Sequence, residues 1–114
     1  MARGRPRKPV GRTRLSHRLL LLIEQQNMSV KDLAIVFESH PYQTVFSWVH
    51  RNREPQKYYR GEVYERLEWL EKLADKYAKK KSTIVPIELK QRERGDYVRN
   101  LVARSFVPQR AAAG

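Results

Sequence analysis

The sequence predicts a mostly α-helical chain with a flexible basic N-terminal arm, and three observations support this prediction. Apolar residues recur every three or four positions from Leu15 to Val49, as they do on one face of a helix. A similar pattern runs from Val63 to Tyr77. The first 14 residues show no such pattern, yet they carry six basic residues and no acidic residue, which is half of the net charge of +12.

The length of 114 residues fits one compact domain with tails. We divide the chain into a disordered basic arm at 1–14, a three-helix core at 15–58 and a long amphipathic helix at 59–82. A C-terminal packing or oligomerisation element at 83–108 and a disordered tail at 109–114 complete the division.

Composition excludes several classes of protein. The chain has no cysteine and three scattered histidines, His17, His40 and His50, so we expect neither disulfides nor a metal site. The longest apolar run, 19–23, is too short for a membrane span. Since the sequence contains no phosphate-binding loop, zinc-protease motif or nucleophile elbow, we expect no enzyme, no cofactor and no small-molecule substrate.

The arm contains a motif with a readable physical logic. Arg3-Gly4-Arg5-Pro6, followed by Arg7-Lys8, resembles the AT-hook, a minor-groove binding motif. Glycine lets the backbone approach the groove floor, and the arginines follow a groove that A·T-rich DNA makes narrow and negative. We therefore expect residues 3–8 to contact the minor groove; a solubilising or localising tail is the alternative.

The first predicted helix runs from Leu15 to Gln26, with Asn27 as its C-terminal cap. Leu20 and Leu21 make it apolar on more than one face. We therefore expect this helix to be enclosed on two sides, either within the domain or against a second subunit.

A second helix begins after Ser29, which forms a capping box with Asp32, and a third spans 41–52, with Pro41 in its first turn. Leu33, Ala34 and Phe37 of the second helix should face inward, as should Val45, Trp48 and Val49 of the third. The remaining side chains of the third helix should lie on its flanks or outer side: Tyr42, Gln43, Phe46, Ser47, His50 and Arg51.

The pattern Leu33-Ala34, Thr44-Val45, Ser47-Trp48 and Arg51-Asn52-Arg53-Glu54-Pro55 resembles the helix-turn-helix domain of Cro/CI-type (XRE-family) transcriptional regulators. The resemblance covers roughly residues 15–80. Two features depart from the family: Glu38 replaces its turn glycine, and the turn is one residue longer. The resemblance implies a helix-turn-helix bundle whose third helix enters the major groove; a three-helix packing unit without a DNA role is the alternative.

If the resemblance holds, Gln43 is the strongest base-reading candidate, because its amide can form a bidentate contact with adenine. Tyr42 and Ser47 are weaker candidates. Phe46 either contacts a thymine methyl or belongs to the core. Side chains expected at DNA phosphates are Arg12, Arg14, Thr44, His50, Arg51, Arg53 and Lys57.

The second half is less distinctive. Val63, Leu67, Leu70, Ala74 and Tyr77 form a seam that either packs on the core or joins two subunits. Further on, Val85, Ile87 and Leu89 alternate as in an edge strand, although Pro86 interrupts the run, and a short helix over 97–102 would be capped by the aspartate at 96. This strand and helix, or a helical hairpin, would form the additional C-terminal element.

Together these patterns predict a DNA-binding transcriptional regulator, either a repressor or an activator, that binds double-stranded DNA as a homodimer. Its expected location is the nucleoid, in the cytoplasm of a bacterial or phage-infected cell. The alternatives are an architectural protein of A·T-rich DNA and a phage DNA-packaging subunit similar to a small terminase.

Overall fold

Helix α1 (Arg14–Gln25) begins the part of the chain that the computed structural model describes, residues 14–107. It is followed by α2 (Val30–Val36), α3 (Tyr42–His50), the short 3₁₀ helix η3 (Lys57–Tyr59), α4 (Arg60–Lys79) and α5 (Gln91–Ser105). Helix makes up 70% of the described residues, and no strand occurs among them. The predicted mostly α-helical class is therefore confirmed.

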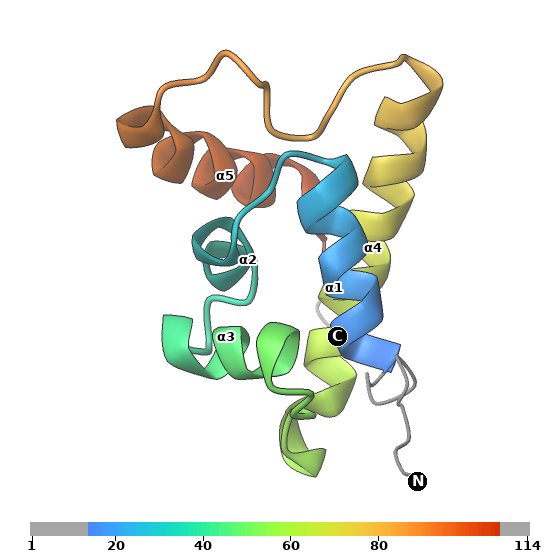
Figure 1. Cartoon of the computed structure of the whole chain (residues 1–114), viewed down its shortest axis with the longest axis vertical. Coiled ribbons are helices and arrows are strands. Elements are labelled where there is room, and N and C mark those ends of the chain that lie inside the picture. Colours follow the sequence, from blue (N-terminus) through green and yellow to red (C-terminus); the bar gives the residue numbers. More distant parts are fainter. Residues whose placement is uncertain (1–13, 108–114) are drawn as a thin grey trace, which may run out of the picture.

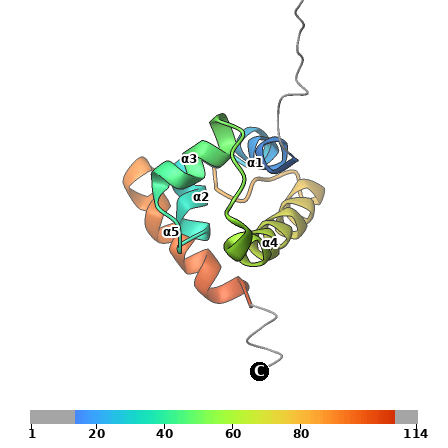
Figure 2. The ribbon, with the colours of Figure 1, turned by 90° about the horizontal axis from the view of Figure 1, so that it is seen from below.

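The helices surround one shared core. In Figure 1, α1 and α4 run side by side, α5 crosses above α2, and α3 lies in the lower part of the molecule, with η3 below it. Figure 2 views this arrangement from below. Every α-helix contributes buried apolar side chains; the largest that are fully enclosed are Trp48, Phe37, Leu15, Leu19, Leu33, Leu67, Leu70 and Ile84.

Helix α1 ends as its sequence predicts. Asn27 has a φ of 57°, the left-handed conformation that often follows a helix and that asparagine tolerates better than most residues. Within this chain α1 is not enclosed on two sides, because Leu20 is half-buried and Leu21 is exposed; enclosure by a second subunit stays a prediction. Only the side formed by Leu15, Leu19 and Leu22 is fully buried.

The start of α2 has the predicted capping box. The Ser29 hydroxyl oxygen accepts a hydrogen bond from the Asp32 N–H at 3.2 Å, and the Asp32 carboxylate accepts one from the Ser29 N–H at 2.9 Å. Helix α3 is shorter than the predicted 41–52. Pro41 precedes its first turn as the N-cap residue, and Asn52, with a φ of 55°, lies beyond its end.

Helix α4 packs its predicted seam against the chain's own core. Val63, Leu67 and Leu70 are fully buried. Arg18 of α1 binds the Glu71 carboxylate with two nitrogens, at 2.8 Å from Nε and 2.5 Å from Nη2, and so joins the two helices. Of the two interpretations of the seam, packing within the chain is the one observed.

The C-terminal segment contains the predicted helix but not the predicted strand. Residues 85–89 form no strand; Val85 is buried, Ile87 is 76% exposed and Leu89 is half-buried, so the alternation does not describe burial. Helix α5 begins at Gln91, well before the predicted cap. Asp96 lies inside the helix, where it pairs with Arg99 at 3.0 Å.

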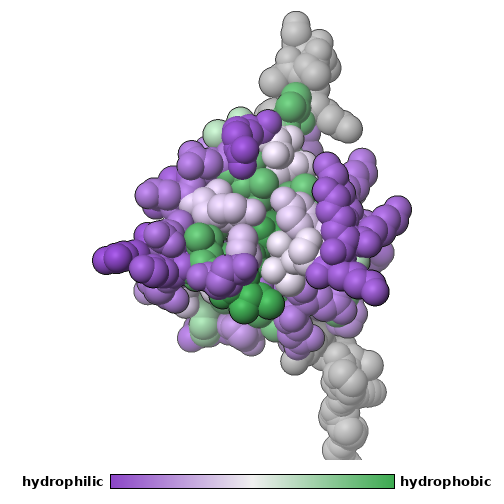
Figure 3. Space-filling model, turned by 90° about the horizontal axis from the view of Figure 1, so that it is seen from above, coloured by the Kyte–Doolittle hydropathy of each residue, from purple (hydrophilic) through white to green (hydrophobic). Residues whose placement is uncertain are grey.

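The face seen from above, opposite α3, is mostly hydrophilic at its rim, with apolar residues gathered near its centre (Figure 3). The connection between α4 and α5 runs across this end of the molecule (Figure 1). Helix α3 lies toward the opposite end of the fold, which this connection does not cover.

Candidate nucleic-acid interface

Helix α3 has one buried face and one exposed face. Val45, Trp48 and Val49 are buried, as their spacing predicts. On the other side Tyr42 is 45% exposed, and Gln43 and His50 are also exposed. The helix is anchored by its apolar face and leaves its other face accessible to a partner.

Three aromatic rings follow one another along the outer side of α3. The ring centres of Tyr42 and Phe46 are 6.0 Å apart, and those of Phe46 and His50 are 4.7 Å apart. The Arg51 guanidinium lies 6.0 Å from the centre of the Phe46 ring. We call Tyr42, Phe46 and His50 the ring ladder.

The other two predicted base-reading residues, Gln43 and Ser47, differ in how available their side chains are for a contact with DNA. Gln43 is exposed at the first turn of α3. Ser47 is half-buried, and its hydroxyl donates a hydrogen bond to the Gln43 carbonyl at 3.0 Å. The hydroxyl proton of Ser47 is thus used inside the helix, which leaves Gln43 as the better candidate for a new contact.

The buried side of α3 is held by aromatic contacts. Trp48 meets the rings of Phe37 and His40 edge-on, at 5.7 and 4.9 Å, and His40 also meets Tyr59 at 4.9 Å. A hollow of about 530 Å³, lined partly by Thr44 and Arg53, opens beside these rings. The aromatic contacts join α2, α3 and η3, and so fix the direction of α3.

The start of α1 is attached to the end of α3. The buried Ser16 hydroxyl donates a hydrogen bond to the Val49 carbonyl at 2.7 Å. Val49 lies in the last turn of α3, where carbonyl groups lack partners inside the helix. This bond satisfies one of them and keeps Arg14, which is exposed two residues before Ser16, close to α3.

Basic side chains follow α3 in the sequence. Arg51, Arg53 and Lys57 are all exposed. Residues 42–60 contain four basic residues and one acidic residue, Glu54, which accepts a hydrogen bond from the Tyr64 hydroxyl at 3.1 Å. Burial raises the pKa of Tyr64 above its ordinary value, and the bond to Glu54 raises it further.

Two of the predicted phosphate contacts, Thr44 and His50, already contact or lie beside other side chains of the domain. Thr44 is half-buried at the hollow, and His50 belongs to the ring ladder. Seven predicted contacts lie outside the described residues: Arg3, Gly4, Arg5, Pro6, Arg7, Lys8 and Arg12.

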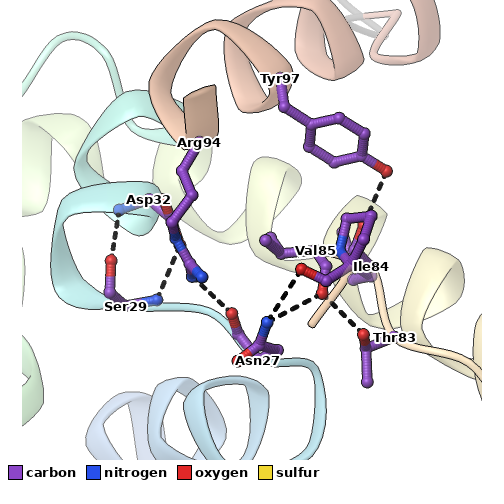
Figure 4. A network of polar contacts seen from close by, with 9 residues as sticks. Asn27, Ser29, Asp32, Thr83, Ile84, Val85, Arg94 and Tyr97 are labelled. Carbon is purple, nitrogen blue, oxygen red and sulfur yellow. Dashed lines mark hydrogen bonds and ion pairs between the residues drawn. The ribbon is translucent and has the colours of Figure 1, made fainter. Parts of the chain in front are cut away.

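A polar network joins the start of α2 to residues 83–97 and supports α2 (Figure 4). The sequence did not predict this network. Arg94 of α5 donates hydrogen bonds at 2.6 Å to the Asp32 carboxylate and to the Asn27 carbonyl. The Asn27 side-chain amide donates to the Val85 and Pro86 carbonyls, at 3.1 and 3.3 Å. The capping box of α2 is therefore fixed by a residue that is 62 positions away from Asp32.

The same network holds the irregular connection before α5. The Tyr97 hydroxyl donates to the Ile84 carbonyl at 2.8 Å, and the Gln26 side chain accepts from the Ile84 N–H at 3.0 Å. The only signal of this in the sequence is the pair of amides at the end of α1, Gln26 and Asn27, whose partners are far away in the chain.

Among residues 14–107, no helix is long and apolar enough to cross a membrane, and no cluster of three or more metal-binding side chains occurs. Comparisons with protein-family models, with curated proteins and with solved structures found no match.

Proposed function

We propose that this protein is a DNA-binding transcriptional regulator in which α2 and α3 form a helix-turn-helix. Helix α3 would enter the major groove, and the basic arm would lie in the adjacent A·T-rich minor groove. The observation that carries the proposal is the exposed outer face of α3, followed directly by Arg51, Arg53 and Lys57.

Dimensions favour this arrangement. A helix with its side chains is about 10–12 Å across, and the major groove is about 12 Å wide. Because α3 lies at one end of the fold and its buried face is anchored by Trp48, its outer face can approach the groove without unfolding the core. Gln43 would then read an adenine by a bidentate contact.

Charge favours the same face. Residues 42–60 have four basic side chains against one acidic one, whereas residues 61–79 have four against five. A phosphate backbone would be attracted to the side of α3 and repelled by that of α4. The exposed Arg51, Arg53 and Lys57 are the expected phosphate contacts.

The bond between Ser16 and Val49 supports a role for the arm. It keeps the start of α1, where the arm is attached, beside the end of α3. Residues 9–13, which link the expected minor-groove contacts at 3–8 to α1, can span about 17 Å when extended, which is about half of one DNA turn of about 34 Å. The arm is therefore long enough to reach the neighbouring minor groove.

The test is selection of bound duplexes from random DNA with the full chain, followed by measurement of affinity at physiological salt. We expect a preferred sequence bound at least about 10³-fold more tightly than random DNA. A two-fold symmetric sequence would indicate a homodimer. A small ratio that follows A·T content would favour an architectural protein instead, and failure to bind any duplex would overturn the proposal.

Two variants separate the roles of helix and arm. Gln43→Ala should weaken the preferred site about 10- to 100-fold and relax preference at one position, whereas Gln91→Ala, an exposed glutamine on α5, should change neither. Deleting residues 2–12 should reduce the slope of log affinity against log salt by about 0.9 for each phosphate that the arm neutralises.

A further inference from the structure

The ring ladder is unusual for an exposed helix face. Outward-facing helix positions are normally polar, yet the exposed Tyr42 and His50 and the half-buried Phe46 each carry an aromatic ring. Within residues 14–107, Phe46 is not one of the side chains that pack against the core cluster. Its ring instead lies between Tyr42 and His50, with centre-to-centre distances of 6.0 and 4.7 Å.

The ladder holds the Phe46 ring in place before any partner binds. Rings on both sides, and the Arg51 guanidinium 6.0 Å from the ring centre, restrict its movement. A side chain that is already ordered loses little conformational entropy on binding. Phe46 therefore presents a fixed apolar surface on the face of α3 that carries Gln43.

The chemistry of the major groove selects what such a surface can contact. A phenyl ring forms no conventional hydrogen bond, so placing it against a base donor or acceptor would remove water from that group without replacing its bond. Thymine is the one standard base that presents a methyl group in the major groove. A methyl group loses no hydrogen bond when the ring covers it.

We propose that Phe46, held by Tyr42 and His50, contacts the C5 methyl group of thymine, so that the site bound by α3 is selected partly by its methyl groups. This inference rests on the proposed function, because it requires α3 to lie in the major groove. It adds a recognition chemistry that is independent of the hydrogen bonds of Gln43.

Replacing thymine by deoxyuridine isolates this contact. Uracil lacks only the methyl group and keeps the same pairing and the same O4 acceptor. Burying one methyl or methylene group changes an equilibrium constant about fourfold. The full chain should therefore bind a duplex with uracil at the contacted position about fourfold more weakly, and about 15-fold more weakly if two methyl groups are contacted.

The experiment scans the selected duplex with uracil at one thymine position at a time and measures the dissociation constant of the unaltered full chain. We expect one or two positions to show the loss and the remainder to show none. Phe46→Ala should bring the thymine-to-uracil affinity ratio at those positions close to one. Tyr58→Ala removes an aromatic ring that is 86% exposed on η3, and it should leave the ratio unchanged.

The outcomes are distinguishable. A ratio of one at every position, with the duplex still bound tightly, would overturn this inference and leave the proposed function intact. A ratio that persists in Phe46→Ala would also overturn it, because the methyl group would then be recognised elsewhere, for example through the arm. Absence of binding to any duplex would overturn both.

Discussion

Replacing Arg94 by methionine tests how strongly the C-terminal helix holds the start of α2. In the folded chain the Arg94 guanidinium lies 2.6 Å from the Asp32 carboxylate, and the two side chains are 16% and 3% exposed. Methionine preserves much of the apolar stem but removes the charge. The Asp32 carboxylate would keep the Ser29 N–H as a hydrogen-bond partner but would no longer have a charged one.

The expected loss of stability follows from this burial. Breaking a buried ion pair by removing one partner costs about 3–5 kcal/mol, because the other charge remains buried. We take the lower end, about 3 kcal/mol, since Asp32 retains a backbone donor. With an m value of about 1.5 kcal/mol/M, the urea midpoint should fall by about 2 M.

The assay is equilibrium urea unfolding followed by far-UV circular dichroism. Arg99→Met is the matched control, because Arg99 is on the same helix but its pair with Asp96 is 64% and 84% exposed. The control should change stability by less than about 0.5 kcal/mol. An effect of Arg94→Met as small as that of the control would show that this pair does not fix α2.

Three further changes have definite expected outcomes in the same unfolding assay. Ser16→Ala should cost about 1–3 kcal/mol, because the Val49 carbonyl would be left without its buried partner; unchanged stability would mean that this bond does not hold α1 to α3. Gly95→Ala should stabilise α5 by about 0.5–1 kcal/mol, since the added Cβ would lie 3.4 Å from the flexible end of Arg99; a loss of stability would contradict this. Burial raises the pKa of Tyr97, and Tyr77 raises it further, so the neutral hydroxyl is favoured in the folded state. That contribution should be complete below the ordinary tyrosine pKa of about 10 and be lost as the pH rises through the higher folded-state pKa, and Tyr97→Phe should make the alkaline decline shallower.

The sequence predicted those elements whose signals are local. The capping box joins Ser29 and Asp32, which are three positions apart, and the inward face of α3 follows from the spacing of Val45, Trp48 and Val49. Helix α4 carries a seam long enough to establish its period. Such patterns depend on neighbours within one or two helical turns, so a single sequence contains them.

The segment between α4 and α5 depends on distant partners, and for that reason the predicted strand and the predicted start of the last helix were wrong. Ile84 and Val85 are buried side by side in an irregular segment, which is stable because Gln26 and Asn27 satisfy its backbone groups. The alternation of apolar and polar residues along this segment does not indicate hydrogen bonds to side chains that are far away in the sequence. Gly95 and Asp96 imitate a helix start, yet α5 continues through both.

The sequence predicted which residues of α3 lie on the candidate interface, but it did not predict how their side chains contact one another. Exposure of Gln43 followed from its position opposite Trp48. The ring ladder did not follow, because residues four apart are neighbours on a helix but the contact between their rings depends on their side-chain conformations. The hydrogen bond that ties up the Ser47 hydroxyl also requires the side-chain conformation.

Backbone amide chemical-shift mapping of the full chain with a duplex at physiological salt tests most directly whether α3 contacts DNA. We expect the largest changes at residues 42–53 and in the basic arm at 1–14, with little change along the exposed side of α4. A map centred on α4 or α5, or spectra that remain unchanged when duplex is added, would contradict the proposed use of α3.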